Sequence, residues 1–167
     1  SCHPGYFNIM PADGMIPCRC PKCEPHIASG RLSELLFGFT DRIARRLADS
    51  GVKGNITAMA YAAYQKPPEK ELSPNIKIML AAPGPWNERN LTEEEKKKED
   101  GLILEWREKT GGNKVSLWNY MLATFGNVAP KGVPTVSPSA VASYYKRNAP
   151  SIDGAFVESG PWSIFHL

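Results

Sequence analysis

The chain has 167 residues, 42% of them hydrophobic and 22% charged, a composition that predicts one core in a single globular domain, residues 1–167. Its formal net charge of +3, with scattered Lys and Arg, is too small to predict a nucleic-acid-binding surface. No apolar run approaches the roughly 20 residues that a membrane helix needs, so we expect no membrane span.

The first predicted element is a strand over residues 6–12, a short apolar run that ends close to an Asp-Gly pair. A helix follows from Leu32, because apolar residues recur there at spacings of three and four. We expect Ser29 or Ser33 to be its N-cap and Gly51 to end it.

Two buried strands come next, over residues 55–61 and 75–81. The connection between them, residues 62–74, contains a Pro-Pro pair and is too short for a full helix. We therefore expect one helix of an α/β repeat to be reduced to a turn here.

Thr92 and Glu95 form a capping-box pattern, which predicts the start of a second long helix. The mixed charges of residues 93–100 are interpreted as the solvated face of this helix. The next predicted strand covers residues 114–120.

Ser137 and Pro138 predict the start of a further helix, which Pro150 ends, and residues 153–158 form the last strand. Strands that are joined by helical crossovers lie parallel, so the order of elements predicts an α/β fold with a parallel sheet. The sheet could be an open doubly wound sheet or part of a barrel. No G-x-G-x-x-G or Walker loop supports a nucleotide-binding open sheet, and a closed (β/α)8 barrel takes about 250 residues.

Polar and aromatic residues follow the C-terminal ends of the predicted strands, where TIM barrels carry their chemistry. Any single aromatic residue at a strand end could equally cover the edge of the core. The residues are Asp13, Tyr61, Tyr64, Trp86, Asn87, Asn119, Tyr120, Glu158 and Trp162.

Three cysteines with the spacing C-x-C-x-x-C, Cys18, Cys20 and Cys23, could share one zinc ion. Tetrahedral zinc needs a fourth ligand, for which Cys2, His3 and His26 are the candidates. Disulfides or free thiols are the alternatives, since four cysteines allow three full pairings. A site with four protein ligands would be structural and would hold the loop.

The chain resembles a bacterial family of domains of unknown function that is grouped with the TIM-barrel glycoside hydrolases and related in layout to α-glucuronidases and hexosaminidases. The motifs that carry the resemblance are P-A-D-G, C-R-C-P-K-C, S-P-N-I-K-I, L-W-N-Y and G-A-F-V-E. The cysteine run is also similar to the zinc loop of family 42 β-galactosidases. The resemblance implies strands four to eight of a TIM-type barrel, a carbohydrate partner and a periplasmic or extracellular location; the sequence alone leaves the compartment open.

Glycoside cleavage needs two carboxyl groups on either side of the scissile bond, and Asp13 and Glu158 are the acids that we place at strand ends. Neighbouring apolar residues would desolvate Asp13 and raise its pKa, which suits a general acid. Asp13 could instead simply favour a turn, and the domain could be a non-catalytic carbohydrate-binding or structural barrel. The predicted substrate-binding residues are Tyr61, Trp86, Asn119, Tyr120 and Trp162.

Overall fold

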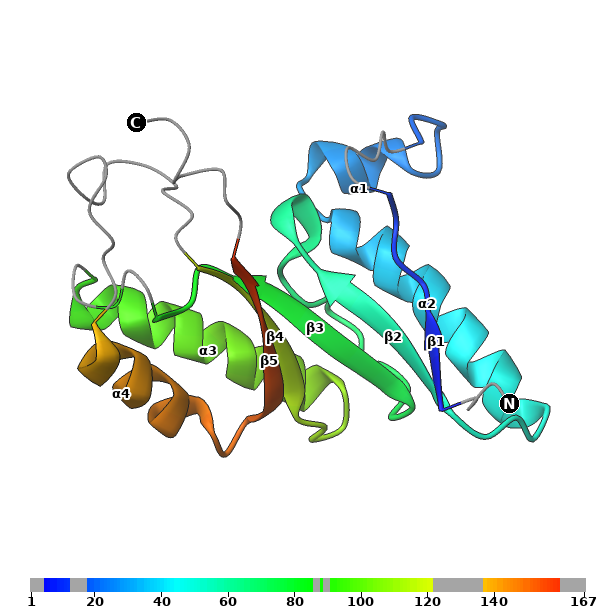
Figure 1. Ribbon diagram of the computed structural model, residues 1–167. Coiled ribbons are helices and arrows are strands. Elements are labelled where there is room, and N and C mark those ends of the chain that lie inside the picture. The colour runs from blue at the N-terminus through cyan, green and yellow to red at the C-terminus, as the bar shows by residue number, and fades with distance from the viewer. Residues whose placement is uncertain (1–4, 13–17, 86–87, 89–90, 122–136, 160–167) are drawn as a thin grey trace.

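The computed structural model describes residues 5–12, 18–85, 88, 91–121 and 137–159, and all statements on structure below concern these residues. Five strands form one sheet in the order β1-β2-β3-β4-β5, and all four neighbouring pairs are parallel, which confirms the predicted parallel α/β fold (Figure 1). The strands are β1 (Tyr6–Asn8), β2 (Asn55–Ala60), β3 (Ile76–Ala82), β4 (Val115–Met121) and β5 (Ile152–Ser159).

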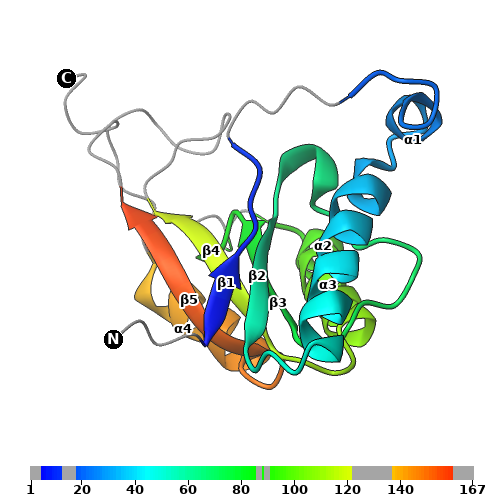
Figure 2. The same ribbon diagram turned by 90° about the vertical axis from the view of Figure 1, so that its right-hand side faces the viewer.

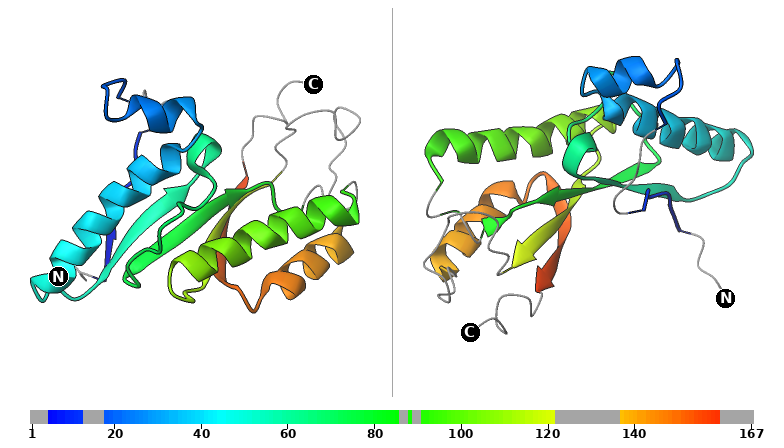
Figure 3. Two further views of the ribbon diagram at one scale, coloured as in Figure 1. Left: turned by 180° about the vertical axis from the view of Figure 1, so that it is seen from behind. Right: turned by 90° about the horizontal axis from the view of Figure 1, so that it is seen from above.

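The long helices lie on one face of the curved sheet, as the view from above shows (Figure 3). They are α2 (Leu32–Asp49), α3 (Glu93–Lys109) and α4 (Pro138–Asn148), with the short helices α1 (Glu24–Ala28) and η1 (Ala62–Tyr64) between strands. The connection between β2 and β3 contains only η1, which confirms that one helix of the repeat is reduced to a turn.

The core lies between the sheet and these helices. Alternate residues of β2, β3 and β4 point into it, and each long helix contributes one large, fully buried aromatic side chain: Phe37 from α2, Trp106 from α3 and Tyr144 from α4. The rings of Phe37 and Trp106 meet edge to face with centroids 4.6 Å apart, and the Trp106 indole N–H donates to the carbonyl of Gln65 at 2.8 Å. We call this the covered face of the sheet.

The other side chains of the strands lie on the opposite face, which we call the open face. No described helix packs on it, although parallel sheets are usually covered on both sides. The side chains that define it are Thr57, Met59, Lys77, Met79, Ser116, Trp118, Tyr120, Phe156 and Glu158.

The strand order is sequential and the long helices lie on one face, whereas a doubly wound sheet reverses its strand order and carries helices on both faces. The sheet is open within the described residues, because β1 and β5 are its two edges. The described chain therefore has the parallel α/β architecture without a closed barrel.

Strand β1 is shorter than predicted. It pairs with β2 only over Tyr6–Asn8, and Ile9 adds one further hydrogen bond, from its N–H to the carbonyl of Thr57 at 2.9 Å. Pro11 has no N–H to donate to the ladder, so the apolar run cannot continue pairing through it.

Candidate functional site

The candidate site lies on the open face of β4 and β5 and runs from the middle of these strands to their carboxyl ends, which Figure 2 shows side by side. Neighbouring strands bring two pairs of side chains together there: Trp118 of β4 is opposite Phe156 of β5, and Tyr120 is opposite Glu158. Because paired residues of a parallel ladder point to the same side, all four side chains share this face.

Trp118 holds this group together. Its ring centroid lies 4.2 Å from that of Phe156, with the planes tilted by 40°, and its indole N–H donates to Oε2 of Glu158 at 2.9 Å. Phe156 remains 48% exposed. The result is an exposed aromatic ring beside a half-buried carboxylate, a combination that suits a ligand with both an apolar face and hydroxyl groups.

Tyr61 follows the end of β2 and is 38% exposed, with its ring against that of Tyr64 at a centroid distance of 6.4 Å. Tyr120 is half-buried beside Glu158. The structure thus puts Tyr61, Tyr120 and Glu158 at the carboxyl ends of β2, β4 and β5, as the sequence predicted.

Asn119 does not lie on the open face, although the sequence predicted a substrate-binding role for it. Its side chain is fully buried on the covered face, where Oδ1 accepts a hydrogen bond from the Tyr145 hydroxyl at 2.8 Å and Nδ2 donates to the carbonyl of Ala82 at 3.3 Å. Strand alternation explains the difference, because neighbours in a strand point to opposite faces and Asn119 lies between Trp118 and Tyr120. The Asn119 amide therefore contributes to packing in this structure.

Six of the residues singled out in the sequence lie outside the described residues: Asp13, Trp86, Asn87, Trp162 and the possible metal ligands Cys2 and His3. Their roles stay predictions. The sequence had suggested that Asp13 directly follows the first strand. This was wrong, because β1 ends at Asn8.

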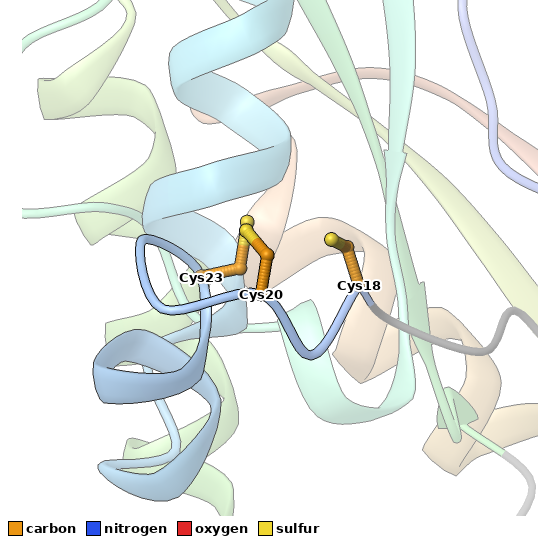
Figure 4. Close-up of side chains that lie close together, drawn as sticks. All are labelled: Cys18, Cys20 and Cys23. Carbon is orange, nitrogen blue, oxygen red and sulfur yellow. The ribbon is translucent and has the colours of Figure 1, made fainter.

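The cysteine loop precedes α1, near the same end of the sheet (Figure 1). The carbonyl of Cys20 accepts hydrogen bonds from the N–H groups of Cys23 (3.0 Å) and Glu24 (2.9 Å), which turns the chain into the helix. Cys18, Cys20 and Cys23 are free thiols whose sulfur atoms all lie within 4.8 Å of one another (Figure 4). Three convergent thiols can hold a metal ion, and soft thiolate ligands suit zinc, so the donor set fits.

The thiols also influence each other's protonation. The pKa of Cys20 is lowered to about 7, because hydrogen bonds stabilise its thiolate. The backbone N–H of Cys23 makes the largest contribution, and the Cys18 thiol makes the second largest. The same arrangement raises the pKa of Cys23 to about 11, chiefly through its hydrogen bond to Cys20. One of the three sulfurs is thus readily deprotonated near neutral pH, and deprotonated sulfur is the form that binds metals.

A polar network under the covered face escaped the sequence interpretation. The Tyr144 hydroxyl donates to Oε1 of Glu99 at 2.7 Å, and burial raises the pKa of that carboxyl group. Residues 93–100 are therefore not all solvated. The signal was present in the spacing, because Glu99 precedes the buried Ile103 by four residues and Trp106 by seven, on one helical stripe.

A second part of this network fixes the loop after β3 to α4. Arg147 donates to the buried carboxylate of Glu88 at 2.7 Å and to Asp100 at 2.6 Å, and Asn148 donates to Asp100 at 2.9 Å. These carboxylates raise the pKa of Arg147 further above its ordinary value. The network stabilises the layer that lies behind the candidate site.

None of the helices in the described part of the chain is both long and apolar enough to cross a bilayer. Comparison with known proteins gave no match among curated proteins and no match among solved structures. A family model described as "Domain of unknown function (DUF4838)" matches residues 3–152. Since the match covers most of the chain, the protein belongs to the DUF4838 family.

Proposed function

We propose that this is a carbohydrate-active domain that binds a sugar on the open face and cleaves a glycosidic bond with Glu158 as one of two carboxyl groups. The observation that carries the proposal is the group of Trp118, Phe156 and Glu158. Aromatic rings offer sugars an apolar platform. A carboxylate beside the platform can accept hydrogen bonds from the sugar hydroxyl groups or assist cleavage.

Asp13 is the proposed second carboxyl group. A pair about 5 Å apart would retain the anomeric configuration, and a pair about 6.5 to 9.5 Å apart would invert it. The support for Asp13 is its position shortly after β1, because parallel strands bring their carboxyl ends to one side of a sheet. Since β1 and β5 are the two edges of the described sheet, the pair also requires the barrel proposed next, which would bring these edges toward each other.

We further propose that the five strands are part of a TIM-type barrel. Sequential order, helices on one face only and two unpaired edges all support this. Strand β5 is the clearest case, since Asp153, Gly154, Ala155 and Phe156 are exposed on both of its faces. In a barrel a following strand would pair with this edge, and a following helix would cover its outer side. The open face would then line the interior, and the sugar would bind where the interior opens at the carboxyl ends of the strands, beside Tyr120 and Glu158.

For the cysteine loop we propose a structural zinc ion. Cys18, Cys20 and Cys23 would supply three ligands, and the ion would hold the chain between β1 and α1. When bound, zinc contributes folding energy to the segment that carries its ligands and takes no part in bond cleavage.

A non-catalytic sugar-binding domain is the second candidate, and the Trp118 hydrogen bond favours it. The Glu158 carboxylate already accepts the Trp118 indole N–H at 2.9 Å, so this oxygen is engaged in orienting the aromatic side chain and not directed at a scissile bond. The two candidates differ in the expected effect of replacing Glu158 by glutamine on hydrolysis.

The test compares Glu158→Gln and Trp118→Phe with wild type, in hydrolysis of chromogenic glycosides, a glucuronide among them, and in calorimetric binding of the corresponding sugars. Glu105→Gln is a matched control, because Glu105 is exposed on α3, away from this site. The hydrolase proposal requires turnover that Glu158→Gln reduces by about 100-fold or more while binding persists. Binding without turnover would favour the second candidate, and the absence of both would refute the carbohydrate proposal.

A further inference from the structure

The three thiols leave a tetrahedral zinc ion one ligand short. Cys18, Cys20 and Cys23 are the only group of three or more potential metal ligands whose donor atoms lie this close together in the described chain. A structural zinc site is closed by four protein ligands. The inference below rests on the proposed zinc ion and identifies its fourth ligand.

His26 lies one helical turn beyond Cys23. Its backbone N–H donates to the carbonyl of Cys23 at 3.1 Å, so the first turn of α1 begins at a thiol ligand and carries the imidazole. Side chains on a helix lean toward its N-terminus, and the cysteine loop lies at that end of α1. The His26 side chain is therefore expected to lean toward the thiols.

One imidazole nitrogen has no partner. Nδ1 of His26 is buried and makes no hydrogen bond, one of only two such side-chain atoms in the part of the chain that is described. Burying a polar atom without a partner is unfavourable, so such an atom calls for an explanation. A bond from Nδ1 to a metal ion would provide the missing interaction.

The surroundings of His26 suit a metal-bound imidazole. The ring lines a hollow of about 350 Å³ between α2 and the segment before β3, together with the carboxyl-bearing side chains Glu34 and Asp41. Imidazoles that bind metals usually donate their second N–H to a carboxylate, a carbonyl or water, which fixes the orientation of the ring. Carboxylates in the hollow are candidates for this role.

We propose that His26 is the fourth zinc ligand, through Nδ1, and that Cys18, Cys20, Cys23 and His26 form a Cys3His site. The imidazole nitrogens are not among the atoms that lie within 4.8 Å of one another, so we expect the ring to turn toward the sulfur atoms on binding. The site then ties the cysteine loop to α1 through four ligands within nine residues.

The test uses His26→Gln, His26→Cys and Cys2→Ser in the whole chain, with His3→Gln as a matched histidine control. Zinc affinity is measured by competition with a chromophoric chelator, and the ligand set is read from the absorption spectrum of the cobalt(II) protein. We expect His26→Gln to lose more than about 100-fold in affinity, the upper range for loss of an outer-shell partner of a metal ligand. His26→Cys should restore affinity with a cobalt spectrum shifted to four thiolates, and Cys2→Ser and His3→Gln should resemble wild type.

Wild-type affinity in His26→Gln, or its loss in Cys2→Ser, would overturn the assignment and leave the proposed zinc ion in place. A wild-type protein that binds no zinc would overturn both. Neither result touches the sugar-binding proposal, because that is measured with sugars. If His26→Gln fails to fold, the spectrum of His26→Cys decides, since an unchanged spectrum would show that residue 26 is not a ligand.

Discussion

On the covered face of the sheet the side chains of β2, β3 and β4 meet α2, α3 or α4, whereas on the open face the side chains of the same strands meet no described helix. The two faces also differ in composition. Ile, Leu, Ala and Val dominate the first, and Trp118, Tyr120, Phe156 and Glu158 stand on the second. Stability is therefore expected to depend on the covered face and ligand chemistry on the open one.

The sharpest test of this contrast is to truncate one tryptophan on each face. Trp106→Ala should lower the free energy of unfolding by about 3–5 kcal/mol, because it leaves a large cavity against Phe37 and removes the indole hydrogen bond to Gln65. Trp118→Ala should cost about 1 kcal/mol, because its side chain is only half-buried. Urea unfolding of both variants measures the difference, and equal losses would contradict the division between the faces.

A substitution of Gly84 tests how tightly the residues beyond the end of β3 pack against the side chain of Asn119. The backbone of Gly84 has φ = +79°, and a Cβ atom there would lie 2.7 Å from the side chain of Asn119. Gly84→Ala should therefore destabilise the protein by about 2–4 kcal/mol, from the left-handed backbone and the clash together. Gly112→Ala is the control, since φ is +86° there but nothing lies within 4 Å of the added atom, so thermal unfolding should show a smaller loss.

The capping box at the start of α3 makes a smaller contribution. The Thr92 hydroxyl accepts from the N–H of Glu95 at 3.2 Å, and the Glu95 carboxylate accepts from the N–H of Thr92 at 2.8 Å. Thr92→Ala should cost about 1 kcal/mol of stability, with Thr92→Ser close to wild type. Denaturant titration measures this, and a loss as large as that of Trp106→Ala would contradict the view that packing dominates the covered face.

Local sequence signals explain which parts of the fold could be predicted. Hydrophobic runs located β2 to β5 within one or two residues, and the capping box and Ser137-Pro138 marked the starts of α3 and α4. Helix α1 was missed because its five residues are too few for an apolar period. The N-cap of α2 is Arg31, which makes no side-chain capping bond, so neither predicted serine serves as the cap.

The candidate site was less predictable because it depends on which face each strand residue occupies. Position at a strand end grouped Asn119 with Tyr120 and Glu158, but alternation sends Asn119 into the core. The partial burial of Glu99 was equally hidden, since Glu99 occupies a run of charged residues and its contact with Tyr144 comes from a distant helix. The orientation of Asn119 and the surroundings of Glu99 depend on tertiary contacts, which a local sequence pattern does not reveal.

The last prediction concerns Glu99, whose half-buried carboxyl group accepts the Tyr144 hydroxyl beside the covered face. Burial, and to a lesser degree the nearby carboxylates of Glu88 and Asp100, raise its pKa, while the Tyr144 hydroxyl and the N–H of Gly84 act in the opposite direction. A carboxyl group whose folded pKa is raised stabilises the fold below its ordinary pKa of 4.5, and this contribution is lost as the pH rises through the folded value.

We therefore expect wild type to lose stability relative to Glu99→Gln as the pH rises from about 4 to 7, because glutamine can still accept the Tyr144 hydroxyl without a charge. Urea unfolding across this range measures the effect. Glu105→Gln is the control, since Glu105 is exposed on the same helix and should not change the pH profile. The opposite slope, with wild type gaining stability as the pH rises, would show that the hydrogen bonds to the Glu99 carboxylate outweigh its desolvation and that the covered face accommodates a charge.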